Sequence, residues 1–443
     1  MHIAIYTDFG KNNIAIPGLR EHKVRGNPTV SWGKIPFDSN IIKYNRKKQK
    51  KTWGKKNMLI TDSVKYVGVD DKTIDLFESQ YVVPNGVSYN SYLILDEKTA
   101  LMDTVDARCT KEWGENVEAA LAGRKLDYIV VQHMEPDHSG SLAYAMEKYP
   151  EAVIVGNAKT FLFLNQFFGV DCADRKLEVK EGDTLELGKH KLTFVMAPMV
   201  HWPEVMVSYE STEKLLFSAD GFGKFGALDT DEDWACEARR YYFNIVGKYG
   251  ASVQVLLKKA KNLDIQKILP LHGPILDSNL EYYLDLYDKW SSYQPETKGV
   301  FIAYASIHGN TAKVAELLAQ KLRDLGEEKV AVADLSREDI AECVEDAFRY
   351  DRMILCSATY DGNAFVPMED FLHHLQIKTY QNRIVGLVEN GTWAPMAAKS
   401  MRSYLETMKN VTILDATVSI RSTYKPSDET ALDCLANAIR ERA

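Results

Sequence analysis

Features that would place the chain in several common protein classes are missing from its sequence. No run approaches the roughly eighteen consecutive apolar residues that a membrane-spanning helix needs, and the first thirty residues lack the apolar core of a secretory signal. The six cysteines are isolated, and none forms the Cys-x-x-Cys pair of a zinc knot or a rubredoxin-type iron site. These absences predict a soluble, cytoplasmic protein with reduced cysteines at positions Cys109, Cys172, Cys236, Cys343, Cys356 and Cys434.

Length and composition are those of a globular protein with more than one domain. The chain has 443 residues, of which 26% are charged and 45% hydrophobic, enough for two or three separate cores. The net charge of −8 is unevenly distributed: residues 1–57 carry 13 Lys and Arg against 3 Asp and Glu, whereas the remainder carries 41 against 59. An acidic body of this kind would repel phosphate backbones, so nucleic acid is not expected as a substrate.

The basic segment 1–57 shows no sustained helical or strand periodicity and ends in a cluster of lysines. One interpretation is an arm that binds nucleic acid or an acidic surface. The other is a disordered extension, with Met58 as the natural first residue of the folded part. We expect the extension, and no functional inference depends on it.

Two patterned regions follow. From residue 58 to about 292, short β-rich runs alternate with helices, and a polar stretch with Pro295 predicts a linker before residue 298. In residues 298–443, five apolar strand candidates are separated by helical patterns, which predicts a doubly wound parallel sheet. The five candidates are Val300–Ala305, Val330–Ala333, Met353–Cys356, Ile384–Val388 and Val411–Leu414.

The strongest chemical signal is a set of metal-ligand side chains placed after strand candidates. His133-Met134-Glu135-Pro136-Asp137-His138 follows the apolar run Tyr128–Val131. His201, Asp220 and His272 each follow a further apolar run. Because strand ends lie along one edge of a packed sandwich, these seven side chains are predicted to share one dinuclear metal site.

This series resembles the metallo-β-lactamase fold, an αββα sandwich, with Glu135 where the usual HxHxDH signature has its second histidine. A carboxylate there favours iron over zinc, and the HxExDH version is similar to that of flavodiiron proteins. The resemblance implies that His133, Glu135 and His201 bind one iron, that Asp137, His138 and His272 bind the other, and that Asp220 bridges them. In some relatives the imidazole matching His138 turns away, so its role as a direct ligand stays open.

The second region carries a candidate phosphate loop. The strand candidate Val300–Ala305 is followed by hydroxyls, a glycine and a helix, whose backbone N–H groups can cradle a doubly charged phosphate. Residues 298–443 contain neither GxGxxG nor GxxxxGK[ST], which favours a mononucleotide. The loop is similar to that of flavodoxins, with His308 where Thr or Ser is common, and two later loops fit the same plan. The predicted FMN-binding residues are Ser306, Ile307, His308, Gly309, Asn310, Thr311, Ser357, Ala358, Thr359, Tyr360, Asp361, Gly362, Asn390, Gly391, Thr392 and Trp393.

Together the two resemblances imply a two-domain flavodiiron protein, with residues 58–292 as the diiron domain and residues 298–443 as the FMN domain. The implied activity is reduction of dioxygen to water, of nitric oxide to nitrous oxide, or of both. Without a CxxC-bearing rubredoxin segment, the electrons are expected from a separate donor such as rubredoxin or a reduced deazaflavin. The family also implies a head-to-tail homodimer, or a dimer of dimers, with no membrane partner.

Two other functions are compatible with parts of the sequence. A zinc hydrolase of the lactamase fold would use a metal-bound hydroxide, although Glu135 and the flavodoxin-like region argue against it. A non-catalytic flavoprotein, acting as an electron carrier or gas sensor, would need no complete ligand set.

Overall fold

The computed structural model describes residues 59–442. The predicted basic arm therefore lies outside the described residues. Within the described part, no helix combines the length and the apolar character that crossing a membrane would require.

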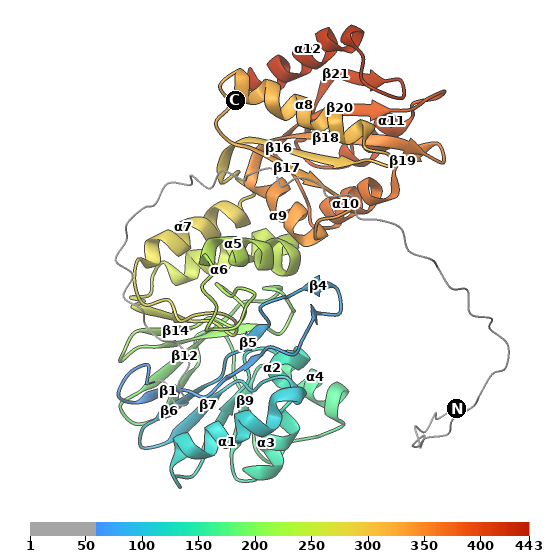
Figure 1. Cartoon of the computed structure of the whole chain (residues 1–443). Helices are drawn as coiled ribbons and strands as arrows, with labels where there is room; N and C mark the ends of the chain where they lie inside the picture. The colour runs from blue at the N-terminus through green and yellow to red at the C-terminus, as the bar shows by residue number, and fades with distance from the viewer. Residues whose placement is uncertain (1–58, 443) are drawn as a thin grey trace, which may run out of the picture. The chain divides into compact units, whose positions relative to one another are not determined.

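The first part of the chain is a four-layer αββα sandwich, as predicted (Figure 1). One mixed sheet has the order β1-β6-β7-β8-β9-β10 and the other the order β11-β12-β13-β14-β15. The first sheet comprises β1 (Val64–Tyr66), β6 (Tyr92–Leu95), β7 (Thr99–Met102), β8 (Tyr128–Val130), β9 (Val153–Gly156) and β10 (Lys176–Glu178). The second comprises β11 (Thr184–Glu186), β12 (Lys191–Met196), β13 (Met206–Glu210), β14 (Leu215–Phe217) and β15 (Lys267–Leu269).

Side-chain alternation along the strands explains how the two sheets pack. In β12, Leu192 and Phe194 share a buried cluster with Tyr92 and Ile94 of β6, whereas Leu93 faces the outer core. Successive strand residues point to opposite faces, so each sheet has one face toward the other sheet and one toward helices. Burying each such large side chain contributes about 1.5–3 kcal/mol.

Helices cover both outer faces (Figure 1). On the first sheet lie α1 (Thr110–Leu121), α3 (Leu142–Lys148) and α4 (Ala158–Phe168), with the short turns η1 (Ala107–Cys109) and α2 (Pro136–Ser139) between them. Beyond the second sheet lie α5 (Trp234–Tyr241), the π-helical turn η2 (Tyr242–Val246), η3 (Gly247–Tyr249), α6 (Gly250–Ala260) and α7 (Leu280–Ser291).

Two small hairpin-like sheets lie at the mouth of this sandwich. They pair β2 (Val69–Asp71) with β5 (Val87–Tyr89), and β3 (Leu76–Phe77) with β4 (Tyr81–Val82). The run Gly86–Tyr92 is divided between two sheets, because β5 pairs with β2 and the next strand, β6, joins the first large sheet.

The second part of the chain is the predicted doubly wound sheet. Five parallel strands have the order β17-β16-β18-β20-β21, and one short antiparallel strand, β19, pairs with the end of β18. Their bounds are β16 (Thr297–Ala305), β17 (Val330–Asp334), β18 (Tyr350–Tyr360), β19 (Asn363–Ala364), β20 (Ile384–Asn390) and β21 (Thr412–Ile420). All five strand candidates are present, and the last runs six residues beyond the expected Leu414.

Helices flank both faces of this sheet. Apolar residues of α8 (Asn310–Asp324) and α12 (Glu429–Arg440) share one core cluster, whereas those of α9 (Ile340–Arg349), α10 (Val366–Ile377) and α11 (Ala397–Leu405) belong to the other. The 3-10 turn η4 (Pro426–Asp428) leads into α12. The order of strands reverses between β16 and β18, which is where doubly wound folds bind ligands.

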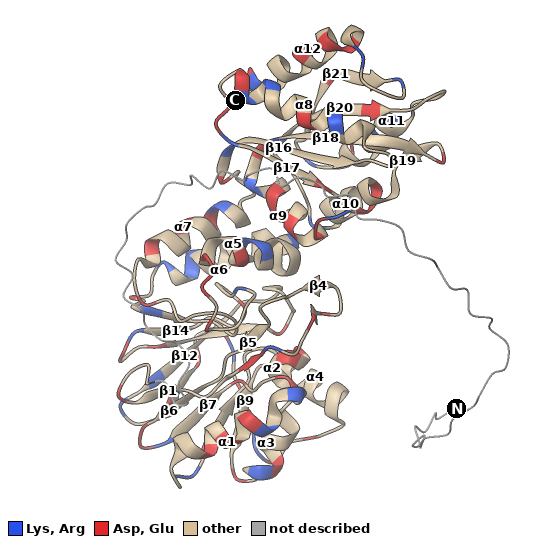
Figure 2. Ribbon diagram, in the orientation of Figure 1, with Lys and Arg blue, Asp and Glu red and all other residues tan. Residues whose placement is uncertain are grey.

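Charged and aromatic contacts join α5 and η2 to α9. Figure 2 shows basic residues on α5 and acidic residues on α9. Arg239 pairs with Glu345 and forms a bidentate contact with Glu296 at 2.7 and 2.8 Å. Phe243 stacks on Phe348 with ring centroids 4.2 Å apart. The backbone oxygen of Asn244, in η2, accepts hydrogen bonds from the Tyr81 hydroxyl and from Lys378 Nζ of the second domain. These contacts fix α9 and the end of α10 against the first domain.

The buried pair of His190 and Glu210 in the αββα sandwich predicts how the free energy of unfolding changes with pH. His190 Nδ1 lies 3.1 Å from Glu210 Oε1, and this hydrogen bond raises the pKa of His190. The stabilisation is therefore complete below the pKa of an unfolded histidine and is lost as pH rises through the folded value. His190→Gln should lower the free energy of unfolding by about 1–2 kcal/mol at pH 6 and by less at pH 9.

Denaturant unfolding of both proteins at each pH measures this difference. The exposed His373 provides the control, since His373→Gln should leave both curves unchanged. An equal loss for His190→Gln at pH 6 and pH 9 would contradict the electrostatic origin of the effect.

Candidate functional site

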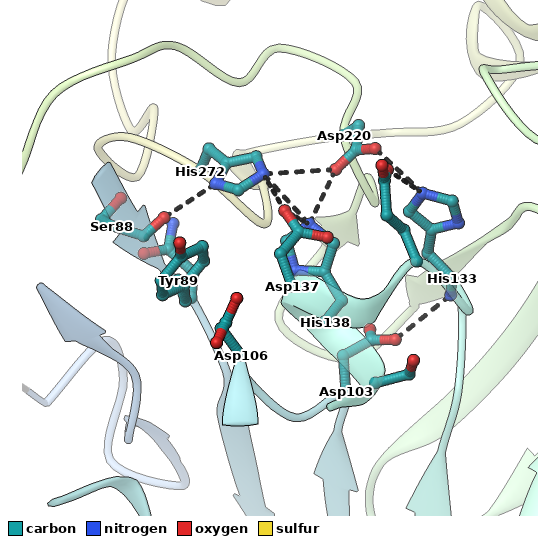
Figure 3. A network of polar contacts seen from close by, with 12 residues as sticks. Ser88, Tyr89, Asp103, Asp106, His133, Asp137, His138, Asp220 and His272 are labelled. Carbon is teal, nitrogen blue, oxygen red and sulfur yellow. Dashed lines mark hydrogen bonds and ion pairs between the residues drawn. The ribbon is translucent and has the colours of Figure 1, made fainter. Parts of the chain in front are cut away.

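All seven predicted metal-ligand residues lie in segments that follow strands, at one edge of the sandwich. Figure 3 shows five of them, namely His133, Asp137, His138, Asp220 and His272. His133 and Glu135 follow β8 of the first sheet, and Asp137 and His138 lie in α2 directly after them. The remaining three come from the second sheet: His201 from the loop between β12 and β13, Asp220 after β14, and His272 after β15. The prediction that these side chains converge agrees with the geometry.

The seven side chains form two adjacent groups. In the first, Nε2 of His201 lies 2.9 Å from Glu135 Oε2, and Nε2 of His133 lies 3.2 Å from the same oxygen. In the second, Asp137 Oδ2 lies 3.1 Å from His272 Nε2 and 3.2 Å from His138 Nε2. His138 therefore points into the second group, with its Nε2 3.0 Å from that of His272.

Asp220 connects the two groups. Its Oδ2 lies 3.3 Å from His133 Nε2 and 3.1 Å from His201 Nε2, whereas its Oδ1 lies 3.1 Å from His138 Nε2 and 3.8 Å from His272 Nε2. Each oxygen of one buried carboxylate thus faces a different group. This is the arrangement that a bridging ligand between two cations requires.

The electrostatics of the site favour cations. Burial alone would lower the pKa of His201, but Asp220 and Glu135 outweigh it and raise that pKa to about 9. In the same way, the carboxylates around His133 raise its pKa well above the usual value in spite of burial. Conversely, the imidazoles lower the pKa of Glu135 and of Asp220 although burial opposes this.

The spacing of the side chains also fits metal ions. Two ligand atoms that each lie about 2.0–2.2 Å from one ion are about 2.8–3.6 Å apart when the angle between them at the ion is between about 90° and the tetrahedral value. Most of the nitrogen-to-oxygen distances within the two groups fall in that range. Both oxygens of Asp137 and of Asp220 are buried without a hydrogen-bond partner among residues 59–442. Asp137 Oδ2 and both Asp220 oxygens lie beside the converging imidazoles. The residues present therefore fit a pair of bound cations.

Strained backbone accompanies the ligands. Met199 and Ala219, close before His201 and directly before Asp220, have positive φ values of 66° and 50°. Non-glycine residues adopt this region at a cost, and such outliers cluster at functional sites.

Three supporting residues were not predicted from the sequence. Glu204 Oε1 accepts from His133 Nδ1 at 2.8 Å, and the backbone oxygen of Ser88 accepts from His272 Nδ1 at 2.8 Å. Asp103 Oδ1 accepts from the backbone nitrogens of Gln132 and His133, and so holds the loop that carries the first ligand. The position of Asp103 after the apolar run 99–102 is the one signal of this kind that the sequence offered.

A cleft of about 470 Å³ leads to the second group from outside. The β3–β4 hairpin forms one wall through Leu76, Phe77 and Glu78, and Tyr89, Asp137 and Arg108 line the other side. Burial together with the charge of Glu135 raises the pKa of Glu78 to about 7. Small solutes can therefore reach the ligand groups past a carboxyl group that titrates near neutrality.

A second cavity, of about 430 Å³, lies at the carboxyl ends of β16, β18 and β20. This volume is typical of small-molecule sites. Gly309, which lies in the chain between the lining residues His308 and Asn310, has φ of 82° and precedes α8, and its N–H donates to Ser306 Oγ at 3.1 Å. At its rim Tyr360 and Trp393 are exposed by 46% and 88%. The phosphate of a bound mononucleotide could lie at the N-terminus of α8, and its flat ring could lie beside the aromatic side chains at the rim.

Fourteen of the sixteen predicted flavin-binding residues line this cavity. The other two, Gly309 and Ser357, do not: Ser357 is buried, and its hydroxyl bonds the backbone of Ala358 and Phe365. The cavity also includes Ala394, Met396 and Ser422, which were not predicted. Ser422 follows β21 at the same sheet edge, but β21 runs beyond the predicted Leu414, so the sequence did not indicate this position.

Comparison with known protein families divides the chain in the same way. The ODP family beta lactamase matches residues 87–273, and the flavodoxin domain matches residues 301–416. The anaerobic nitric oxide reductase flavorubredoxin of Aliivibrio fischeri is 31% identical over 363 residues, covering 78% of this chain and 72% of the relative. An uncharacterised protein of Methanocaldococcus jannaschii is 28% identical over 381 residues, covering 85% of this chain and 95% of that protein.

Solved structures give the same result. Rubredoxin oxygen:oxidoreductase from Desulfovibrio gigas aligns with a TM-score of 0.81 at 27% identity, covering 87% of this chain and 98% of that structure. The flavodiiron protein from Giardia intestinalis aligns with a TM-score of 0.80 at 25% identity, covering 88% and 99%. With the two ligand groups, the mononucleotide cavity and the order of its two domains, this chain belongs to the flavodiiron protein family.

Proposed function

We propose that this protein reduces dioxygen to water or nitric oxide to nitrous oxide at a diiron centre supplied with electrons by FMN. The observation that supports it is the two ligand groups sharing Asp220 in a chain that also carries a mononucleotide cavity. When bound, two ferrous ions and reduced FMN together supply the four electrons that dioxygen needs, or the two that a pair of nitric oxide molecules needs.

The ligand assignment is part of the proposal. His133, Glu135 and His201 would hold one iron, Asp137, His138 and His272 would hold the other, and Asp220 would be shared between them. The inward direction of His138 Nε2 supports its inclusion as a direct ligand. Asp220 is buried, and it orients both groups because its two oxygens are directed apart.

The surrounding residues have definite tasks in this proposal. Glu78 lies at the cleft wall beside Glu135 and titrates near neutrality, so it can hold and pass a proton at its carboxyl oxygen. The Arg108 guanidinium donates to the Tyr89 hydroxyl at 3.0 Å and keeps that ring at the cleft mouth. Residues 298–443 hold FMN, with the α8 N-terminus and Ser306 at its phosphate.

Partners and location belong to the same proposal. The electrons come from a separate donor, such as rubredoxin or a reduced deazaflavin, and two copies associate head to tail so that one subunit's flavin serves the other's metals. The exposed apolar rim of Ile307, Tyr360 and Trp393 supports an association at the flavin cavity. The six free cysteines accord with a reducing compartment such as the cytoplasm.

Comparing the two gases tests the function directly. The purified holoprotein is reduced under argon and its turnover with dioxygen and with nitric oxide is measured with the same donor. Rapid reoxidation of the flavin by at least one gas is expected, and the faster gas identifies the substrate. Slow reoxidation by both, with iron and FMN bound, would indicate an electron carrier or sensor, and bound zinc with esterase turnover would indicate a hydrolase.

Replacing Glu135 tests the metal preference. Glu135→His should lower the iron content relative to zinc and abolish gas reduction, because a neutral imidazole replaces a hard oxygen ligand. Metal analysis and turnover measure both effects. The exposed Glu147 provides a control, since Glu147→His should leave metal content and activity unchanged. Unaltered iron content and turnover in Glu135→His would refute the ligand assignment.

Replacing Trp393 tests the flavin cavity. Its side chain is 88% exposed, so Trp393→Ala should leave the melting temperature of the flavin-free protein unchanged. Loss of stacking, about 1–2 kcal/mol, should weaken FMN binding by about 5- to 30-fold. Quenching of FMN fluorescence measures the affinity, and the exposed Tyr282 of α7 serves as the control through Tyr282→Ala. Equal FMN affinities in wild type and Trp393→Ala would exclude stacking on this ring.

A further inference from the structure

The ligand imidazoles differ in what their second ring nitrogen contacts. His133 Nδ1 lies 2.8 Å from the carboxylate oxygen Glu204 Oε1, whereas His272 Nδ1 meets the neutral backbone oxygen of Ser88 at the same distance. His138 Nδ1 is buried and has no hydrogen-bond partner among the described residues. Of these three ring nitrogens, only that of His133, in the first group, contacts a carboxylate.

Glu204 is placed to act on His133 and not as a ligand. It is fully buried, and its Oε1 also accepts from the backbone nitrogen of Met134 at 2.9 Å. It contacts the ring nitrogen that faces away from the ligand groups, and it does not belong to either group. Its second oxygen, Oε2, is buried without a donor among residues 59–442.

A buried carboxylate with a free oxygen is costly unless its charge is used. Holding Met134 and the nearby loop would need only a neutral acceptor. A charged acceptor on Nδ1 does more, since it fixes the proton on that nitrogen, leaves the Nε2 lone pair directed into the first group, and increases the basicity of the ring.

We propose that Glu204 is a positioning residue that makes the two metal positions unequal. Acting through His133, it strengthens metal binding at the position held by His133, Glu135 and His201. An ion there is also harder to reduce than its neighbour, because Glu204 adds negative charge to that side. The other position, with Asp137, His138 and His272, has no equivalent carboxylate on the ring nitrogens described above. This inference rests on the metal centre proposed above.

Removing the charge while keeping the shape tests the proposal. Glu204→Gln is introduced, and the metal-free, FMN-loaded protein is titrated anaerobically with Fe²⁺ in a calorimeter. The wild type should bind two equivalents. The variant should bind one of them about 10- to 100-fold more weakly and the other unchanged. Spectroelectrochemical titration of the iron-loaded proteins should show one reduction step shifted to higher potential.

Glu210→Gln is the matched control. Glu210 is also fully buried and also contacts a histidine, His190, but in β13 and outside the two ligand groups. This variant should lower the melting temperature while leaving both Fe²⁺ affinities and both reduction steps unchanged.

A double-mutant cycle separates positioning from folding. His133→Gln removes the residue through which Glu204 acts, so adding Glu204→Gln to it should cause little further loss of Fe²⁺ affinity. Additive losses would overturn the proposal, as would equal weakening of both equivalents or unchanged affinity in Glu204→Gln. A wild type that fails to bind two equivalents would instead overturn the diiron centre itself.

Discussion

Three carboxylates and four imidazoles converge in one buried region of the first domain. Holding them there costs electrostatic and desolvation free energy, which the rest of the domain must offset. Neighbouring carboxylate groups repel one another and lose hydration when they are buried, so they can stay together only when protons or metal cations neutralise them. The sheets meet this requirement with rigid strand ends. The buried cluster shared by β6 and β12 fixes the two sheets, and these in turn fix His133 on one side and Asp220 on the other.

The positions of the ligands could be predicted from the sequence because each ligand follows an apolar strand. The run before His133 and the run before Asp220 are short and uninterrupted, and residues directly after strands gather on one edge. The same reasoning located the cavity loops of the second domain, since β16, β18 and β20 each contain an apolar segment. Local patterns were therefore sufficient wherever a strand placed the residue.

Residues placed by long-range packing could not be predicted in this way. Glu204 lies 71 positions from His133 in the sequence, and Ser88 lies 184 positions from His272. Nothing local distinguishes Glu204 from an ordinary loop glutamate, and Ser88 acts through a backbone oxygen that every residue has. The direction of the Ser357 hydroxyl could not be predicted either, because Ser357 lies within β18 and its hydroxyl bonds the backbone of Ala358 and Phe365. The split of Gly86–Tyr92 between two sheets likewise depends on pairing with β2, a distant partner.

The carbonyl of Asn244 has a mechanical consequence. In the π-helical turn η2 this one oxygen receives the Tyr81 hydroxyl from the hairpin over the cleft and the Lys378 ammonium from the end of α10. Tyr81 and Lys378 also touch each other at 3.3 Å. Displacing α10 would therefore also displace β4, the strand that carries Tyr81. Movement of the FMN domain and access through the cleft to the metal centre are coupled in this way through the Asn244 oxygen.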